Sequence, residues 1–225
     1  MMRRGAWRAL RRFWENDLGL SVFLGLLVLV LFVLPLAEPQ GKGRGLVLDT
    51  AFSALLLAGV AAFSVRPALR AVLFALVVGT TAVRWIAFSP AATAASALVS
   101  VGAMAFVVLV QTFRAGPVNI HRIQGAVAAY LLLGLACAQA YELVALLATG
   151  AFAIASADPR RHVFVYFSFV TLTTVGYGDV TPVHPVARSI AIVEALTGQL
   201  YPAILLARLV SAAGSRGAGA PPQAR

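Results

Sequence analysis

The sequence predicts an all-α membrane protein with six transmembrane helices and a short re-entrant helix. Hydrophobic residues make up 60% of the chain and charged residues only 12%, whereas soluble domains are about 45–50% apolar and about 25% charged. Several apolar runs approach the roughly 20 residues that a helix needs to cross a bilayer. A run with two glycines, residues 173–179, interrupts this pattern between the last two long apolar segments.

The net charge of +10 is carried almost entirely by arginine, since Lys42 is the one lysine. Basic residues flank the apolar runs, so we attribute them to orientation in a membrane and expect lipid, and no nucleic acid, as a partner. The one cysteine, Cys137, lies inside an apolar run and cannot form an intrachain disulfide. We expect it to pack in the protein interior.

The front of the chain predicts four spans. Residues 1–17 form a basic, partly amphipathic segment that we expect at the cytoplasmic surface. The first apolar run could also be a signal peptide, but it is longer than the usual apolar region of one, which favours a retained helix. We therefore predict a four-helix front domain over residues 18–113, with spans at 18–36, 46–63, 68–88 and 91–113.

The rest of the chain predicts a second domain, residues 125–212. A polar linker, residues 114–124, precedes it along the cytoplasmic interface, and a flexible cytoplasmic tail, residues 213–225, follows it. Within this domain we predict spans at residues 125–147 and 186–212. Residues 163–173 are apolar but too few to cross a bilayer, so we predict a re-entrant helix there.

The distribution of positive charge predicts the orientation. Loops on the cytoplasmic side are expected to hold more arginine and lysine than loops outside. If both termini are cytoplasmic, the inner segments carry most of the basic residues, which predicts a multi-pass protein of the cell membrane. The inner residues are Arg3, Arg4, Arg8, Arg11, Arg12, Arg66, Arg70, Arg114, Arg122, Arg208, Arg216 and Arg225, and the outer ones are Lys42, Arg44, Arg160, Arg161 and Arg188.

The glycine-containing run is the most informative part of the chain. Two glycines within five residues disfavour a helix, and irregular backbone at membrane depth persists only where protein buries it or it lines a cavity. Consecutive carbonyls can face one axis if alternate residues take left-handed backbone angles, which glycine accepts most readily. The run reads Thr173, Thr174, Val175, Gly176, Tyr177, Gly178, Asp179.

This run matches the selectivity-filter signature of potassium channels. The chain resembles bacterial six-helix potassium channels with a single pore loop and no arginine-rich voltage sensor, most specifically over residues 121–212; the front four spans match only in number. The resemblance implies that K⁺, as the permeant ion, is held by the carbonyls of Thr174, Val175, Gly176 and Tyr177, with Gly178 completing the filter. It implies no cofactor and no enzymatic activity. One filter copy per chain implies a homotetramer.

The resemblance also assigns supporting residues around the filter. In many relatives two tryptophans occupy the positions of Tyr166 and Phe167, and the first holds the aspartate that corresponds to Asp179. This chain departs from that pattern, so Tyr166 could either donate its hydroxyl to Asp179 or simply pack. Thr173 is expected at the junction of the pore helix and the filter, and Thr171 is expected to support the filter from the pore helix.

The sixth span contains the expected gate. By resemblance Gly198 is a hinge, and Pro202 weakens the same turn because proline lacks an N–H and its ring clashes with the carbonyl four residues earlier. The alternative is a static kink that only shapes the cavity. Gln199 and Leu206 are expected to face the aqueous cavity or the inner gate.

Three ionisable residues lie within or near the spans, where such residues are usually functional. We expect Glu142 and Glu194 to be structural braces rather than ion sites, with Glu194 bonded to the pore helix, for example through Thr171. Arg84 is expected to pair with Asp49 or to extend toward the interface.

The predicted function is that of a potassium-selective channel that is not steeply voltage-gated. The fourth span, residues 91–113, holds no arginine or lysine, whereas voltage sensors move several charges per subunit. The alternative is a weakly selective cation channel of the same fold. A carrier is disfavoured because the sequence has no internal repeat, and an enzyme because it has no catalytic or metal-binding motif.

Overall fold

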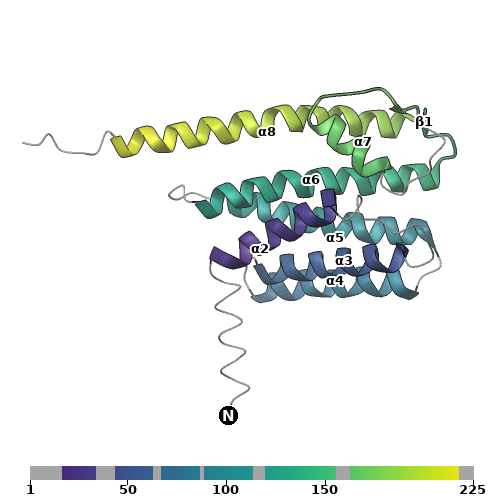
Figure 1. Cartoon of the computed structure of the whole chain (residues 1–225), viewed down its shortest axis with the longest axis horizontal. Coiled ribbons are helices and arrows are strands. Elements are labelled where there is room, and N and C mark those ends of the chain that lie inside the picture. Colours follow the sequence, from purple (N-terminus) through teal and green to yellow (C-terminus); the bar gives the residue numbers. More distant parts are fainter. Residues whose placement is uncertain are drawn as a thin grey trace, which may run out of the picture.

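The computed structural model describes residues 17–33, 44–62, 67–86, 89–113, 120–155 and 163–217 of the chain. Long helices lie side by side along one direction, and helix α8 extends beyond its neighbours at its C-terminal end (Figure 1). The helices are α2 (Asp17–Val28), which continues as the π-helical segment η1 (Leu29–Val33), α3 (Arg44–Ala62), α4 (Pro67–Ile86), α5 (Pro90–Thr112), α6 (Ile120–Leu147), α7 (Val163–Leu172) and α8 (Pro185–Gly217).

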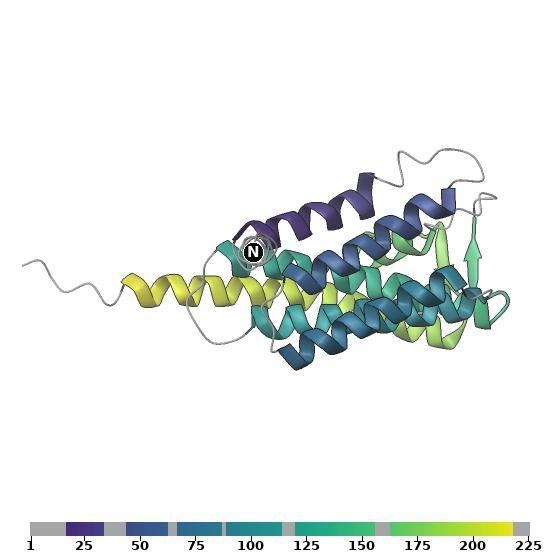
Figure 2. The ribbon, with the colours of Figure 1, turned by 90° about the horizontal axis from the view of Figure 1, so that it is seen from below.

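Helix α6 separates two groups of helices. Helices α2 to α5 lie on one side of it and helices α7 and α8 on the other, as two perpendicular views show (Figures 1 and 2). Within the described residues, the four helices α4, α5, α6 and α8 are long and apolar enough to cross a membrane. The apolar parts described in the first two helices are shorter, Gly19–Val33 and Thr50–Ala62. The chain is therefore a mostly helical membrane protein, and the number of six spans stays a prediction.

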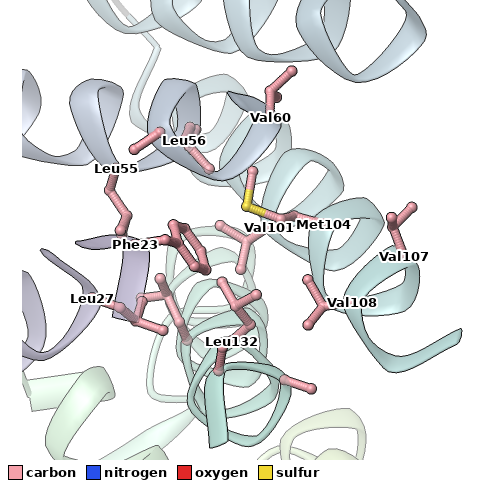
Figure 3. Packing of buried hydrophobic residues seen from close by; sticks show 14 of the residues in the cluster. Phe23, Leu27, Leu55, Leu56, Val60, Val101, Met104, Val107, Val108 and Leu132 are labelled. Atoms are coloured by element: carbon pink, nitrogen blue, oxygen red, sulfur yellow. The ribbon is translucent and has the colours of Figure 1, made fainter. Parts of the chain in front are cut away.

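The core of the front group reaches α6. Phe23 and Leu27 of α2 are fully buried, and the side chain of Leu132 of α6 is buried in the same cluster (Figure 3). At Gly59 of α3 a β-carbon would lie only 2.3 Å from the sulfur of Met104 of α5, so a larger residue there would require the flexible Met104 side chain to move. Apolar burial of this extent accounts for the packing of the front helices against the second domain.

Helix ends agree with local sequence signals in the front group but differ from the prediction in the second domain. Ser89 caps α5, accepting a hydrogen bond from the N–H of Ala92, and Pro90 follows as the first helical residue. Helix α6 begins at Ile120, so the last five residues of the predicted linker are helical. Helix α8 continues to Gly217, beyond the predicted end of the sixth span at residue 212.

A two-stranded antiparallel sheet joins the segment before α7 to the segment before α8. Strand β1 (Phe152–Ile154) pairs antiparallel with strand β2 (Val180–Pro182), with Ala153 opposite Thr181. The N–H groups of Val183 and His184 both donate to the carbonyl of Ala151, at 2.9 and 3.1 Å. The loop predicted over residues 149–161 therefore contains a strand. This strand pairs with the segment that follows residues 173–179, the run that matches the filter signature and is called the filter run below.

Candidate functional site

The filter run begins on the C-terminal end of α7. The N–H of Thr174 donates to the carbonyl of Thr171 at 2.9 Å. The N–H groups of Val175 and Gly176 both donate to the carbonyl of Val170, at 2.9 and 3.3 Å. Carbonyls in the last turn of a helix lack partners within the helix, and here the filter run supplies them. The hydroxyl of Thr173 adds a bond to the carbonyl of Phe169 at 2.6 Å.

Every second residue of the filter run has a left-handed backbone. The φ angles are 59° at Thr174, 58° at Gly176 and 79° at Gly178. Glycine accepts such angles readily, but threonine is β-branched and rarely adopts them. Thr174 is the one non-glycine residue with a positive φ among the residues that the structure describes. The alternation of left-handed residues that is expected for a row of carbonyls is therefore present. At Thr174 this left-handed backbone is strained.

The hydrogen bonds also fix where these carbonyls point. In a planar trans peptide the C=O points away from the N–H of the same peptide unit. Because the N–H groups of Val175 and Gly176 point to Val170 in α7, the carbonyls of Thr174 and Val175 point away from α7. Two successive carbonyls of the filter run thus face the side that the subunit leaves open.

Side chains of the filter run are exposed in the single subunit. Tyr177 is 71% exposed and Val175 53% exposed, although both are large and apolar or aromatic. The ring of Tyr177 stacks in parallel on the ring of Tyr166, with 6.4 Å between centroids.

Tyr166 and Asp179 lie on either side of the filter run and contact each other. The Tyr166 hydroxyl donates to Oδ2 of Asp179 at 2.8 Å, and the N–H of Val180 donates to Oδ1 at 3.1 Å. This hydrogen bond raises the pKa of the Tyr166 hydroxyl above its usual value. The structure thus contains the bond rather than simple packing. Whether it supports a filter stays a prediction.

We expect substitutions of Tyr166 and Asp179 to have non-additive effects on the free energy of unfolding. Tyr166→Phe should lower the free energy of unfolding by about 1 kcal/mol, the net contribution of one such bond, and Asp179→Ala removes the same bond together with the one from the N–H of Val180. The double variant should lose no more than Asp179→Ala alone, because the Tyr166 bond is already absent there. Thermal unfolding of all four proteins measures this, and additive losses would show that the two residues act independently.

Gly198 brings α8 into contact with the end of α7. A β-carbon at this position would lie 1.8 Å from the carbonyl oxygen of Leu172, which is far inside van der Waals contact. The hydroxyl of Tyr130 donates to the same oxygen at 3.3 Å. Helix α8 is continuous through Gly198 and Pro202. The glycine therefore has a packing role that the sequence did not reveal, and its role as a hinge stays a prediction.

Gln199 reaches the first residue of the filter. Its Nε2 donates to the hydroxyl of Thr174 at 2.9 Å. We expected Gln199 at the cavity or inner gate, and the structure places its amide at the base of the filter run. Leu206, two turns further along α8, is 62% exposed in the single subunit. Its position at a cavity stays a prediction.

Glu194 is buried where α6, α7 and α8 meet. It is only 1% exposed, and its carboxyl contacts Ser168 of α7 and Tyr141 of α6. The expected bond to the pore helix is present, but through Ser168 instead of Thr171, because Ser168 lies on the side of α7 that faces α8. Glu142 lies next to Tyr141 on α6 and is half-buried; its bracing role is untested.

Arg84 contacts an aromatic ring. Its guanidinium lies 4.6 Å from the centroid of Phe52 in α3, a cation–π arrangement. The side chain of Asp49, the expected partner, lies outside the described part of the chain. Arg84 thus joins α4 to α3.

The second half of α8 is held against the rest of the subunit by aromatic residues. The hydroxyl of Tyr201 donates to the carbonyl of Ala126 in α6 at 2.8 Å. The ring of Tyr201 packs edge-on against Phe113 at the end of α5, with centroids 5.8 Å apart, and Arg208 lies over the same Phe113 ring at 5.1 Å. The segment after Gly198 therefore contacts both the front group and α6.

Metal-binding side chains do not gather at this site. Among the residues that the structure describes, no group of three or more histidine, cysteine, aspartate or glutamate side chains could hold a metal ion. The oxygen atoms that the site offers are backbone carbonyls and the Thr174 hydroxyl, which are ligands suited to alkali cations rather than to transition metals.

Comparisons with known proteins agree with this assignment for part of the chain. A family model described as "Ion channel" matches residues 142–214, which include α7, the filter run and most of α8. Two proteins named Protein LctB, from Bacillus caldotenax and Geobacillus stearothermophilus, are each 54% identical over 46 residues. That match covers 20% of this chain, and the chain spans about a third of the relatives' length, 34%. No solved structure matches at a significant level. Residues 142–214 of this membrane protein therefore resemble an ion channel domain.

Proposed function

We propose that four copies of this chain form a potassium-selective channel in the cell membrane. K⁺ would pass down its electrochemical gradient through a filter made of residues 174–178, with no cofactor. The ion would be held by the carbonyls of Thr174, Val175, Gly176 and Tyr177 and by the Thr174 hydroxyl, which replace its hydration shell. A weakly selective cation channel of the same fold is the alternative.

The observation that carries this proposal is the alternation of left-handed residues at 174, 176 and 178. Such an alternation turns successive carbonyls toward one side. The N–H groups that bind Val170 direct the first of these carbonyls away from α7. The N–H groups of this segment bind α7 on one side, and its carbonyls point to the other side. These carbonyl oxygens are therefore available to bind a cation.

The exposure of the filter run supports a tetramer. One strand cannot surround an ion, whereas rings of carbonyls from four strands can. The exposed side chains of Tyr177 and Val175 would be covered by neighbouring subunits in a closed cyclic assembly. The C-terminal end of α7, which carries partial negative charge, would point toward the ion path below the filter.

Gating would occur in α8 after Gly198. The contact between Gly198 and Leu172 fixes the first part of α8 against the pore helix. Pro202 lacks an N–H and so removes the bond to the carbonyl of Gly198, which makes this turn the easiest place to bend. Helix α5 has no basic residue between Pro90 and Thr112, so steep voltage dependence is not expected.

Ion flux into liposomes tests the proposal. The purified protein is reconstituted, its oligomeric state is measured, and uptake is followed with a K⁺ gradient and then with an equal Na⁺ gradient. We expect tetramers and K⁺ flux that exceeds Na⁺ flux by at least about tenfold, which corresponds to about 1.4 kcal/mol of discrimination. Equal fluxes would support the weakly selective alternative. A monomer that conducts neither ion across a range of voltages and pH values would contradict both.

A further inference from the structure

A buried polar cluster lies behind the filter run, where α6, α7 and α8 meet. It consists of Cys137 and Tyr141 of α6, Ser168 of α7 and Glu194 of α8. Tyr141 and Ser168 are fully buried, and Glu194 is 1% exposed. The Cys137 thiol also forms a hydrogen bond with the carboxyl. Tyr130 of α6 is the further titratable group that interacts electrostatically with Glu194. None of these partners carries a positive charge that could balance a carboxylate.

Three short contacts between oxygen atoms connect this cluster. The carbonyl oxygen of Gly134 in α6 lies 2.6 Å from Oγ of Ser168. The same Oγ lies 2.5 Å from Oε1 of Glu194, and the other carboxyl oxygen, Oε2, lies 2.5 Å from the Tyr141 hydroxyl. Each contact of this length between oxygens requires one proton.

Counting protons decides the charge of the carboxyl. A carbonyl oxygen brings no proton, and the hydroxyls of Ser168 and Tyr141 bring one each. An ionised Glu194 would therefore leave two protons for three contacts, and two oxygens would face each other without a proton between them. A protonated Glu194 supplies the third. The thiol of Cys137 brings its own proton for its contact with the carboxyl.

We propose that Glu194 is uncharged in the folded protein and acts as a hydrogen-bond donor that positions α7 between α6 and α8. Oε1 donates to Ser168, Ser168 donates to the carbonyl of Gly134, and Tyr141 donates to Oε2. This arrangement satisfies every oxygen in the cluster and links three helices through a single serine. Glu194 lies one turn before Gly198, which contacts the end of α7, so it is a positioning residue for the base of the filter.

Burial favours the same state. An isolated carboxylate in an apolar interior is strongly disfavoured, whereas a neutral carboxyl with complete hydrogen bonds is tolerated. A neutral glutamate and a glutamine have the same shape and offer a donor and an acceptor at the same positions. Glu194→Gln should therefore preserve all three contacts, with the amide nitrogen donating to Ser168 and the amide oxygen accepting from Tyr141.

Infrared spectroscopy of the purified full-length protein at neutral pH tests the charge directly. We expect the wild type to show the carbonyl stretch of a protonated carboxylic acid, and the difference spectrum against Glu194→Gln to assign this band to Glu194. A carboxylate band in that difference spectrum in place of the acid band would overturn the proposal. The measurement needs no ion flux, so its outcome is independent of whether the protein conducts K⁺.

Thermal unfolding tests the positioning role. Glu194→Gln should melt within about 2 °C of the wild type. Glu194→Ala leaves the Tyr141 hydroxyl without its acceptor and Ser168 with only the carbonyl of Gly134, so it should melt more than about 5 °C lower. Equal losses in the glutamine and alanine variants would contradict a neutral brace. If the alanine variant does not fold, Tyr141→Phe replaces it: the acid band should persist at a shifted frequency, and its disappearance would overturn the proposal.

The pH dependence of unfolding gives a second readout. The folded protein keeps a proton that the unfolded chain releases above about pH 4.3, the usual pKa of glutamate. The folded state then binds more protons than the unfolded state, so stability falls as pH rises. We expect the unfolding constant of the wild type, relative to Glu194→Gln, to rise by about tenfold per pH unit and per subunit from that pH until the folded protein also releases the proton, and to level off above that point. The same pH profile in both proteins would contradict the proposal.

Discussion

Replacing Gly198 with alanine should destabilise the subunit by about 3 kcal/mol or more, at the upper end of the cost of overpacking. The new β-carbon would lie 1.8 Å from the carbonyl oxygen of Leu172. That oxygen belongs to backbone at the end of α7, so no side-chain rotation relieves the clash, and α7 and α8 must separate. Thermal unfolding of the purified protein measures the loss directly.

Gly102→Ala is the matched control for this prediction. Gly102 also lies within a long helix, α5, but a β-carbon there would meet nothing within 4 Å. Alanine is favoured over glycine in a helix interior by about 1 kcal/mol, so this variant should be as stable as the wild type or more so. If Gly198→Ala also kept wild-type stability while its K⁺ flux changed, a hinge would explain the glycine better than close packing.

Replacing Gly176 with alanine should reduce K⁺ flux to roughly a tenth of the wild-type value or less. Gly176 has a φ of 58°, and a left-handed backbone costs an alanine about 1–2 kcal/mol. In the proposed tetramer this cost would arise in four strands that share one ion path, so the filter should relax to other backbone angles. Flux in liposomes at equal protein density measures the effect.

Gly150→Ala is the control that distinguishes strain within the filter run from backbone strain elsewhere in the subunit. Gly150 has a φ of 76° and, like Gly176, open space where a β-carbon would lie. The substitution therefore introduces comparable backbone strain, but in the turn between α6 and β1 and not in the filter run. We expect this variant to lose stability and to retain K⁺ flux per folded channel. Equal loss of flux in both variants would mean that strain anywhere in the outer loops stops conduction.

The sequence predicted the features that depend on local patterns. Apolar runs and the Ser89–Pro90 signal placed the long helices to within a few residues, and two glycines in one short run indicated irregular backbone at residues 174–178. The length of residues 163–173 indicated a short helix before this run, and the structure has α7 there. These features follow from hydropathy and backbone preference, which act within one segment.

The features that the sequence did not predict depend on distances between segments. Nothing in residues 152–154 identifies residues 180–182 as their partner, because strands of three residues give almost no alternation. Gly198 could be explained as a hinge from its position in the helix, and only the approach of Leu172 reveals its packing role. Likewise Thr171 and Ser168 differ by three positions on α7, and the rotation of the helix decides which one meets Glu194.

The contact between the end of α5 and α8 has a consequence for assembly. Phe113, at the end of α5, meets Tyr201 of the same chain, and α6 begins only a few residues later, at Ile120. The front helices therefore pack on the second domain of their own subunit, and each subunit can complete its fold before it meets another. Subunits of this kind would fold first and associate afterwards. When two variants are reconstituted together, we expect their channels to contain both in the proportions of random mixing.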